Sequence, residues 1–172
     1  MLEEREDADL SLREIARSVG VSATAVYRHF PDKEALRAAL ASAAYDRMGE
    51  AQRAAASAYE DVLDQFQATG RTYVRFALDH PALFRLMSSM GPHDDLFALD
   101  DGEDDDASKL LRDYAFRLAG EGASIDTVRA IAMRSWALVH GLAVLMLQGY
   151  VPRDEALIDA VVDTRALGMN RS

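Results

Sequence analysis

The stretch LSLREIARSVGVSATAVYRHFPDKEALRAAL, from Leu10 to Leu40, decides the fold. Ser11 and Glu14 have the spacing of a capping box, in which two side chains satisfy each other's free backbone donors at a helix start. Gly20 follows and can adopt the positive φ that a tight turn requires. Ser22 then caps a second short helix. Two short helices joined by such a turn predict a helix-turn-helix, whose second helix can enter the major groove of DNA.

Apolar side chains at helical spacing support this pairing. Leu12, Ile15 and Ala16 form one stripe on the first helix, and the small Ala16 lets the second helix approach closely. Val21 and Val26 would fill the angle between the two helices. Spacing, turn chemistry and caps therefore agree on the same motif.

A signature at the end of this stretch resembles the DNA-binding domain of the TetR family of transcriptional regulators. An aromatic residue, a variable residue and a His-Phe pair precede the Lys that opens the next helix, and here they are Tyr27, Arg28, His29, Phe30 and Lys33. The resemblance is contiguous over residues 10–40 and implies a DNA-binding transcriptional regulator.

The resemblance implies that residues 23–29 form the recognition helix. Tyr27 and Lys33 would anchor phosphates, and Arg28 can place its two nitrogens on guanine O6 and N7. Tyr27 and His29 also fit a packing role, so both interpretations stay open. The DNA-binding residues implied by the resemblance are Ser22, Ala23, Thr24, Ala25, Tyr27, Arg28, His29 and Lys33.

The segment before this motif is shorter than the family pattern. The family's DNA-binding domain has three helices, and its first helix starts a dozen or more residues before the point matched by Leu10. Residues 1–9, MLEEREDAD, resemble only the tail of that helix. Either the start of this sequence is mis-assigned or trimmed, or the first helix is truncated. For a chain with this start we expect weak DNA binding and lower stability in the N-terminal third.

The rest of the chain predicts an all-α fold without convincing strands. Four prolines fall where helical patterns break, and apolar residues recur three and four positions apart. The expected helices cover residues 33–56, 59–79, 82–90, 108–120, 124–148 and 153–167. The expected domains are a helix-turn-helix DNA-binding domain at 1–45 and a helical effector-binding and dimerisation domain at 46–172.

The C-terminal part carries a second resemblance. His80-Pro81 and the segment RSWALVHGLAVLMLQG, with Trp136, His140 and Gly141, resemble a C-terminal domain of TetR regulators named for Trp, His and Gly. That resemblance implies a homodimer formed through the last two helices, and a C-terminal half that encloses an effector pocket. The helix at 124–148 is apolar around most of its circumference, which requires cover on several sides.

A pocket for a small, largely apolar effector would use adaptable aromatic and Met side chains from the middle helices. Each candidate also fits an ordinary core position. The scattered histidines do not predict a metal site, and no cofactor is expected. The candidates are Phe66, Tyr73, Phe76, Phe84, Met87, Tyr114, Trp136 and His140.

A net charge of −10 would argue against DNA binding, because phosphate binding needs a basic surface, but the acidic residues are concentrated in two segments. Residues 94–106 hold eight acids and no base, and residues 1–9 contribute −4. Residues 10–37 carry +2, which predicts modest, salt-sensitive affinity for DNA. The negative net charge therefore comes mostly from one expected loop between helices and from the acidic N-terminal residues.

Composition and motifs weigh against other classes. A chain without cysteine, secretory signal or Gly-rich phosphate loop, and without a Ser-His-Asp order, favours a cytoplasmic protein that is not an enzyme. The uncharged stretch at 135–152 is better explained as a buried helix than as a membrane span. The leading interpretation is a repressor released from a palindromic operator by its effector. The alternative is a module of the same fold that binds proteins or ligands but not DNA.

Overall fold

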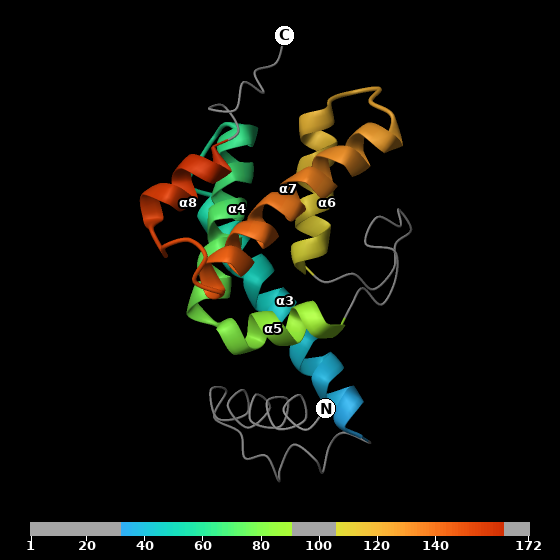
Figure 1. Cartoon of the computed structure of the whole chain (residues 1–172). Coiled ribbons are helices and arrows are strands. Elements are labelled where there is room, and N and C mark those ends of the chain that lie inside the picture. Colours follow the sequence, from blue (N-terminus) through green and yellow to red (C-terminus); the bar gives the residue numbers. More distant parts are fainter. Residues whose placement is uncertain (1–31, 91–105, 164–172) are drawn as a thin grey trace.

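A computed structural model of the chain describes residues 32–90 and 106–163, and within these ranges the regular structure is entirely helical (Figure 1). The prediction of an all-α fold is confirmed. Predictions on residues 1–31, including the helix-turn-helix and the truncated first helix, lie outside the described ranges. The helices are α3 (Lys33–Ala56), α4 (Val62–Asp79), α5 (Pro81–Met90), α6 (Asp106–Ala119), α7 (Ile125–Leu147) and α8 (Glu155–Val162).

Side-chain caps set where several helices begin. Asp32 Oδ1 accepts a hydrogen bond of 2.7 Å from Ala35 N at the start of α3. Asp61 accepts from two backbone N–H groups, so α4 begins at Val62 rather than at the predicted residue 59. Asp154 caps α8 in the same way, which moves its start from the predicted residue 153 to Glu155.

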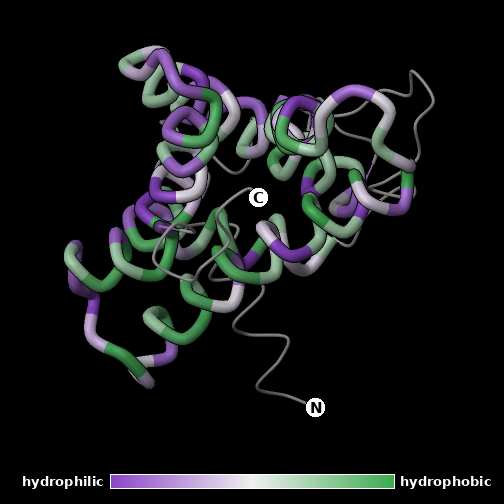
Figure 2. Tube along the Cα trace, turned by 90° about the horizontal axis from the view of Figure 1, so that it is seen from above, coloured by the Kyte–Doolittle hydropathy of each residue, from purple (hydrophilic) through white to green (hydrophobic). Residues whose placement is uncertain are grey.

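Helix α3 runs without interruption through residue 45, where the sequence predicted a domain boundary. It packs against α4, α5 and α6, and α4 also contacts α7 and α8 (Figure 1). The central core lies between these helices and contains the almost fully buried Met48, Val74, Met146 and Ile158. Hydrophobic and hydrophilic residues alternate along the helix tubes, as expected for helices with one buried side (Figure 2).

One side of α7 lacks cover within the described chain. Met133 and Leu145 are 45% and 42% exposed, Ala137 between them is also exposed, and a Cβ added at Gly141 would meet no atom within 4 Å. These residues are four positions apart and therefore share one face of the helix. By length and composition alone, helix α7 could cross a membrane, and 28% of its most apolar 18-residue stretch is buried within the protein.

Candidate functional site

A cavity lies between α3, α4, α6 and α7, with one contribution from α8. The space open to the centre of a water-sized sphere amounts to about 90 Å³. Its lining is mostly apolar, and none of the described lining residues carries a charge. The lining residues are Tyr45, Met48, Gln52, Phe66, Gln67, Thr69, Gly70, Tyr73, Ala107, Ser108, Leu110, Leu111, Ser135, Trp136, Leu138, Val139 and Val162.

Gln52 supplies an unusual polar group in this lining. Its side chain is 7% exposed, and its Nε2 donates a hydrogen bond of 3.1 Å to the Thr69 carbonyl oxygen. That bond fixes the amide, and Gln52 Oε1 has no hydrogen-bond partner within the described residues. Buried polar atoms are nearly always paired in folded proteins, so this acceptor is a candidate for a hydrogen bond from a bound molecule.

An aromatic chain of hydrogen bonds forms another part of the wall. Tyr73 OH lies 2.9 Å from His140 Nδ1, and Trp136 Nε1 donates to Tyr73 OH over 3.4 Å. Burial raises the pKa of Tyr73 and lowers the pKa of His140. Because Trp136 can only donate, a neutral His140 that accepts at Nδ1 satisfies all three groups.

The start of α6 is held against α3 beside the cavity. Arg53 forms an ion pair with Asp106, which lowers the pKa of that carboxyl group and raises the pKa of the guanidinium. Asp46 Oδ1 accepts a long hydrogen bond of 3.5 Å from Asp106 N. Gly49 sits under this contact, because a Cβ built on it would come within 2.8 Å of Ala107 N. The two helices therefore approach closely where α6 supplies cavity wall.

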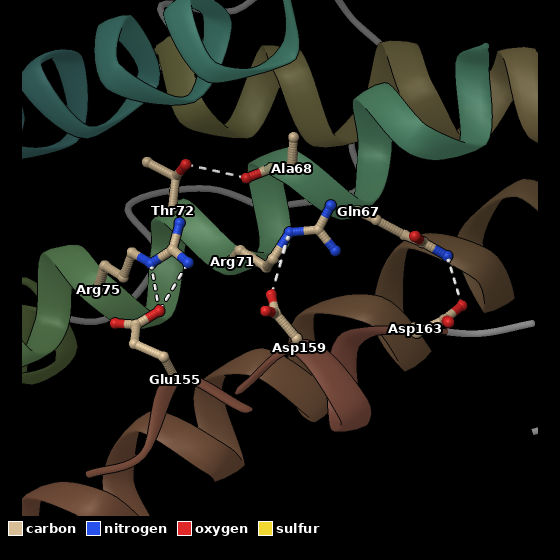
Figure 3. A network of polar contacts seen from close by, with 8 residues as sticks. All are labelled: Gln67, Ala68, Arg71, Thr72, Arg75, Glu155, Asp159 and Asp163. Atoms are coloured by element: carbon tan, nitrogen blue, oxygen red, sulfur yellow. Dashed lines mark hydrogen bonds and ion pairs between the residues drawn. The ribbon is translucent and has the colours of Figure 1, made fainter. Parts of the chain in front are cut away.

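A ladder of polar contacts joins α4 to α8 along their length (Figure 3). Arg75 donates through Nε and Nη2 to Glu155 Oε2, at 2.9 and 2.6 Å. Arg71 pairs with Asp159 at 3.6 Å. At the far end, Gln67 Nε2 donates to Asp163 Oδ1 over 3.2 Å (Figure 3).

Sequence reasoning missed this ladder, although its signal is readable. Polar residues at 67, 71 and 75 on one helix match acids at 163, 159 and 155 on another. Spacing of four places each row along one helix face, and the reversed order fits antiparallel helices. Exposed ion pairs contribute little to stability, so the ladder mainly fixes the position of α8.

The structure brings together only some of the predicted pocket residues. Phe66, Tyr73 and Trp136 line the cavity, and the other five do not. Tyr114 packs on Phe66 with ring centroids 5.6 Å apart, and His140 reaches the cavity wall only through Tyr73. Phe76, Phe84 and Met87 belong to the central core.

The predicted DNA-binding residues at positions 22–29 lie outside the described residues. Lys33 opens α3 as predicted, but its side chain also falls outside the description. Among the described residues, no group of three or more His, Cys, Asp or Glu could hold a metal ion.

Comparisons with known proteins match both halves of the chain. Residues 2–40 match a family model described as bacterial regulatory proteins of the tetR family. Residues 66–165 match one described as a tetracyclin repressor-like C-terminal domain. The Trp-His-Gly subtype stays a prediction, since the matched description does not name it.

A solved structure gives a matching fold. It is the structure of a protein with unknown function from Rhodococcus sp. RHA1, which is 28% identical in sequence to this chain and superposes with a TM-score of 0.63. The alignment covers 93% of this chain and 84% of that one. No curated protein matches.

Proposed function

Since this chain belongs to the TetR family and is a DNA-binding transcriptional regulator, we propose that it is a repressor released from a palindromic operator by a ligand in its C-terminal cavity. The DNA-binding residues proposed for this role are those at positions 22–29 together with Lys33. The ligand occupies the cavity between α3, α4, α6 and α7. The protein acts on DNA in the cytoplasm.

The continuity of α3 carries this proposal. The helix begins at Lys33, inside the matched DNA-binding region, and reaches the cavity wall at Tyr45, Met48 and Gln52. At 1.5 Å per residue, Lys33 and Gln52 are about 28 Å apart along one unbroken helix. A tilt of α3 at the cavity therefore displaces the N-terminal end of the helix, which belongs to the DNA-binding region.

Ligand binding controls DNA binding only if the ligand prefers one position of α3. A ligand that fits the cavity better when α3 is tilted shifts the population toward that conformer. In a dimer, the tilt changes the separation of the two recognition helices, which must be about 34 to 36 Å, or a multiple, to reach successive major grooves. The difference in ligand affinity between the two conformers sets the strength of the coupling.

The uncovered face of α7 supports the homodimer that this mechanism needs. Met133, Ala137, Gly141 and Leu145 form an apolar stripe, and Tyr150 just beyond the helix is 76% exposed. Small residues at the middle of the stripe allow another helix to approach closely. A second copy that places α7 and α8 against the same helices buries this stripe in a four-helix interface.

A mobility-shift assay with the upstream DNA of the chain's own gene tests the proposal. The full chain should shift this DNA in a salt-sensitive manner, because phosphate contacts release counterions. Arg28→Ala and Lys33→Ala should each weaken binding by about five- to a hundredfold, the usual effect of losing one base or phosphate contact.

Arg117→Ala is the matched control. Arg117 is an exposed arginine on α6 that packs over the Tyr114 ring, far along the chain from the DNA-binding region. This variant should bind DNA like the unchanged protein. Absence of any sequence-specific shift would favour the alternative, a module of the same fold that binds proteins or ligands but not DNA.

A further inference from the structure

The unpaired oxygen of Gln52 restricts the chemistry of the ligand, and this step rests on the proposed function of the cavity. Gln52 lines the cavity, and its Oε1 is a buried hydrogen-bond acceptor that no described residue satisfies. Its partner must be a donor, since an amide oxygen has no proton to give. Leaving such an acceptor buried and unpaired is unfavourable, so a ligand that donates to it gains affinity by removing that cost.

Rotating the Gln52 amide to exchange its oxygen and nitrogen would lose an existing hydrogen bond. Gln52 Nε2 already donates to the Thr69 carbonyl oxygen, and a rotated amide would place two acceptor oxygens against each other. Gln52 is also held at the contact between two helices, because it belongs to α3 and Thr69 belongs to α4. The position and type of the unpaired group are therefore set by the fold.

Four other polar residues of the lining already form hydrogen bonds within the protein. Thr69 Oγ1 donates to the Phe66 carbonyl, and Gln67 Nε2 donates to Asp163. Tyr73 OH is shared between Trp136 and His140. Gln52 Oε1 therefore differs from these groups in having no protein partner within the described residues.

The lining also excludes a charged ligand. None of its described residues is Lys, Arg, His, Asp or Glu, so a buried carboxylate or ammonium would find no counter-charge there. Apolar side chains such as Met48, Phe66, Leu111 and Val139 instead suit an apolar body.

From these contacts we infer that the cavity binds an uncharged, mostly apolar molecule that carries an N–H or O–H group and donates a hydrogen bond to Gln52 Oε1. The oxygen is fully buried. The donor therefore reaches it through a small displacement of neighbouring side chains, for which the flexible Met48 on the same helix is suited.

Matched pairs of small probes test this inference on the full chain without DNA. Indole and benzofuran have nearly the same shape, but only indole carries a donor, and phenol and toluene form a smaller pair of the same kind. Trp136 is the one tryptophan of the chain and lines the cavity, so its indole N–H signal in a nitrogen-correlated NMR spectrum reports binding at this site. Titration of each probe gives its dissociation constant.

The decisive quantity is the ratio of donor to non-donor affinity in each variant. Gln52→Met keeps the length of the side chain and removes the acceptor, so it should lower the indole-to-benzofuran affinity ratio by about two- to tenfold, the usual effect of one neutral hydrogen bond. Gln65→Met is the matched control, because Gln65 lies on α4 outside the lining, and its amide already donates to the Tyr59 carbonyl oxygen and accepts from Tyr114 OH. It should leave the ratio unchanged.

Several outcomes would overturn the inference. These are an unchanged ratio in Gln52→Met, no shift of the Trp136 signal by any of the four probes, or tighter binding of the anion indole-3-acetate than of indole. The experiment is independent of the regulator proposal, because it contains no DNA. A chain that binds the probes as expected but shifts no operator would contradict the regulator and retain the ligand chemistry.

Discussion

Tyr73 OH lies 2.9 Å from His140 Nδ1, and this contact joins the middle of α4 to the middle of α7. Trp136, one helical turn before His140, donates to the same hydroxyl. Tyr73 and Trp136 also line the cavity, so this chain of three side chains is part of the candidate ligand site. Its integrity depends on the protonation state of His140, because a doubly protonated imidazole cannot accept at Nδ1.

Stability should therefore fall at mildly acidic pH. Burial lowers the pKa of His140 in the folded chain below its ordinary value of 6.5, so the unfolded chain binds more protons as the pH drops through that value. The associated stability is present above pH 6.5 and is lost between that pH and the lower folded pKa, with a slope of at most about 1.4 kcal/mol per pH unit. Chemical denaturation between pH 8 and 5 measures it.

His140→Gln is the matched comparison, since its amide oxygen can still accept from Tyr73 but does not titrate. The variant should show a shallower loss of stability over the same pH range. Equal slopes in both proteins would mean that His140 does not carry the effect.

Gly49→Ala should destabilise the fold, although helix propensity alone predicts the opposite sign. Alanine in a helix interior is favoured over glycine by about 1 kcal/mol. At this position the added Cβ would lie 2.7 Å from Asp106 Cβ and 2.8 Å from Ala107 N, so α6 would have to move. We expect a net loss of about 1 to 3 kcal/mol in the free energy of unfolding, measured by urea denaturation.

Ala43→Gly calibrates the propensity effect on the same helix. Ala43 is exposed on α3, so its replacement should cost about 1 kcal/mol without any change in packing. If Gly49→Ala were more stable than the unchanged protein, the close approach of α3 and α6 would be wrong.

The sequence predicted the helices best where local signals mark their ends. Residues 124–148 were expected as one helix, and α7 spans Ile125–Leu147 with Ser124 as its cap and Gly149 at positive φ just beyond it. The start of α8 was placed two residues early because the capping role of Asp154 was not recognised. Such signals depend on a few neighbouring residues, and a sequence displays them directly.

The cavity was harder to predict, because residue type does not separate a cavity wall from a core. Phe84 and Met87 have the same character as Phe66, yet they pack in the central core while Phe66 lines the cavity. Gln52 was missed altogether, since it lies in the Ala- and charge-rich segment GEAQRAAA, which has no clear apolar stripe. Its burial and its unpaired oxygen arise only when α3, α4 and α6 come together.

Leu145→Glu should dissociate the proposed homodimer. Leu145 is 42% exposed in the single chain and lies on the apolar stripe of α7, where a second copy would bury its carboxylate replacement without a counter-charge. Light scattering coupled to size-exclusion chromatography should give the mass of a monomer for this variant and of a dimer for the unchanged chain.

Phe116→Glu provides the control for this experiment. Phe116 is 47% exposed, so it is an equally accessible large apolar residue, but it lies on α6. This variant should remain dimeric. Dissociation of both variants, or of neither, would count against an interface built on α7.

Gln52→Leu should leave the fold as stable as before or more stable, although it removes a buried hydrogen bond. The bond from Nε2 to the Thr69 carbonyl is worth about 1 kcal/mol, whereas an unpaired buried acceptor such as Oε1 costs about 1 to 3 kcal/mol. Gln67→Leu should instead lower stability by about 1 kcal/mol, because it breaks the contact with Asp163 that ends the α4–α8 ladder. Urea denaturation of both variants measures the contrast. A large decrease in the free energy of unfolding of Gln52→Leu would mean that Oε1 is already satisfied. An increase would mean that Gln52 lowers the stability of the unliganded chain, as expected for a residue kept for ligand binding.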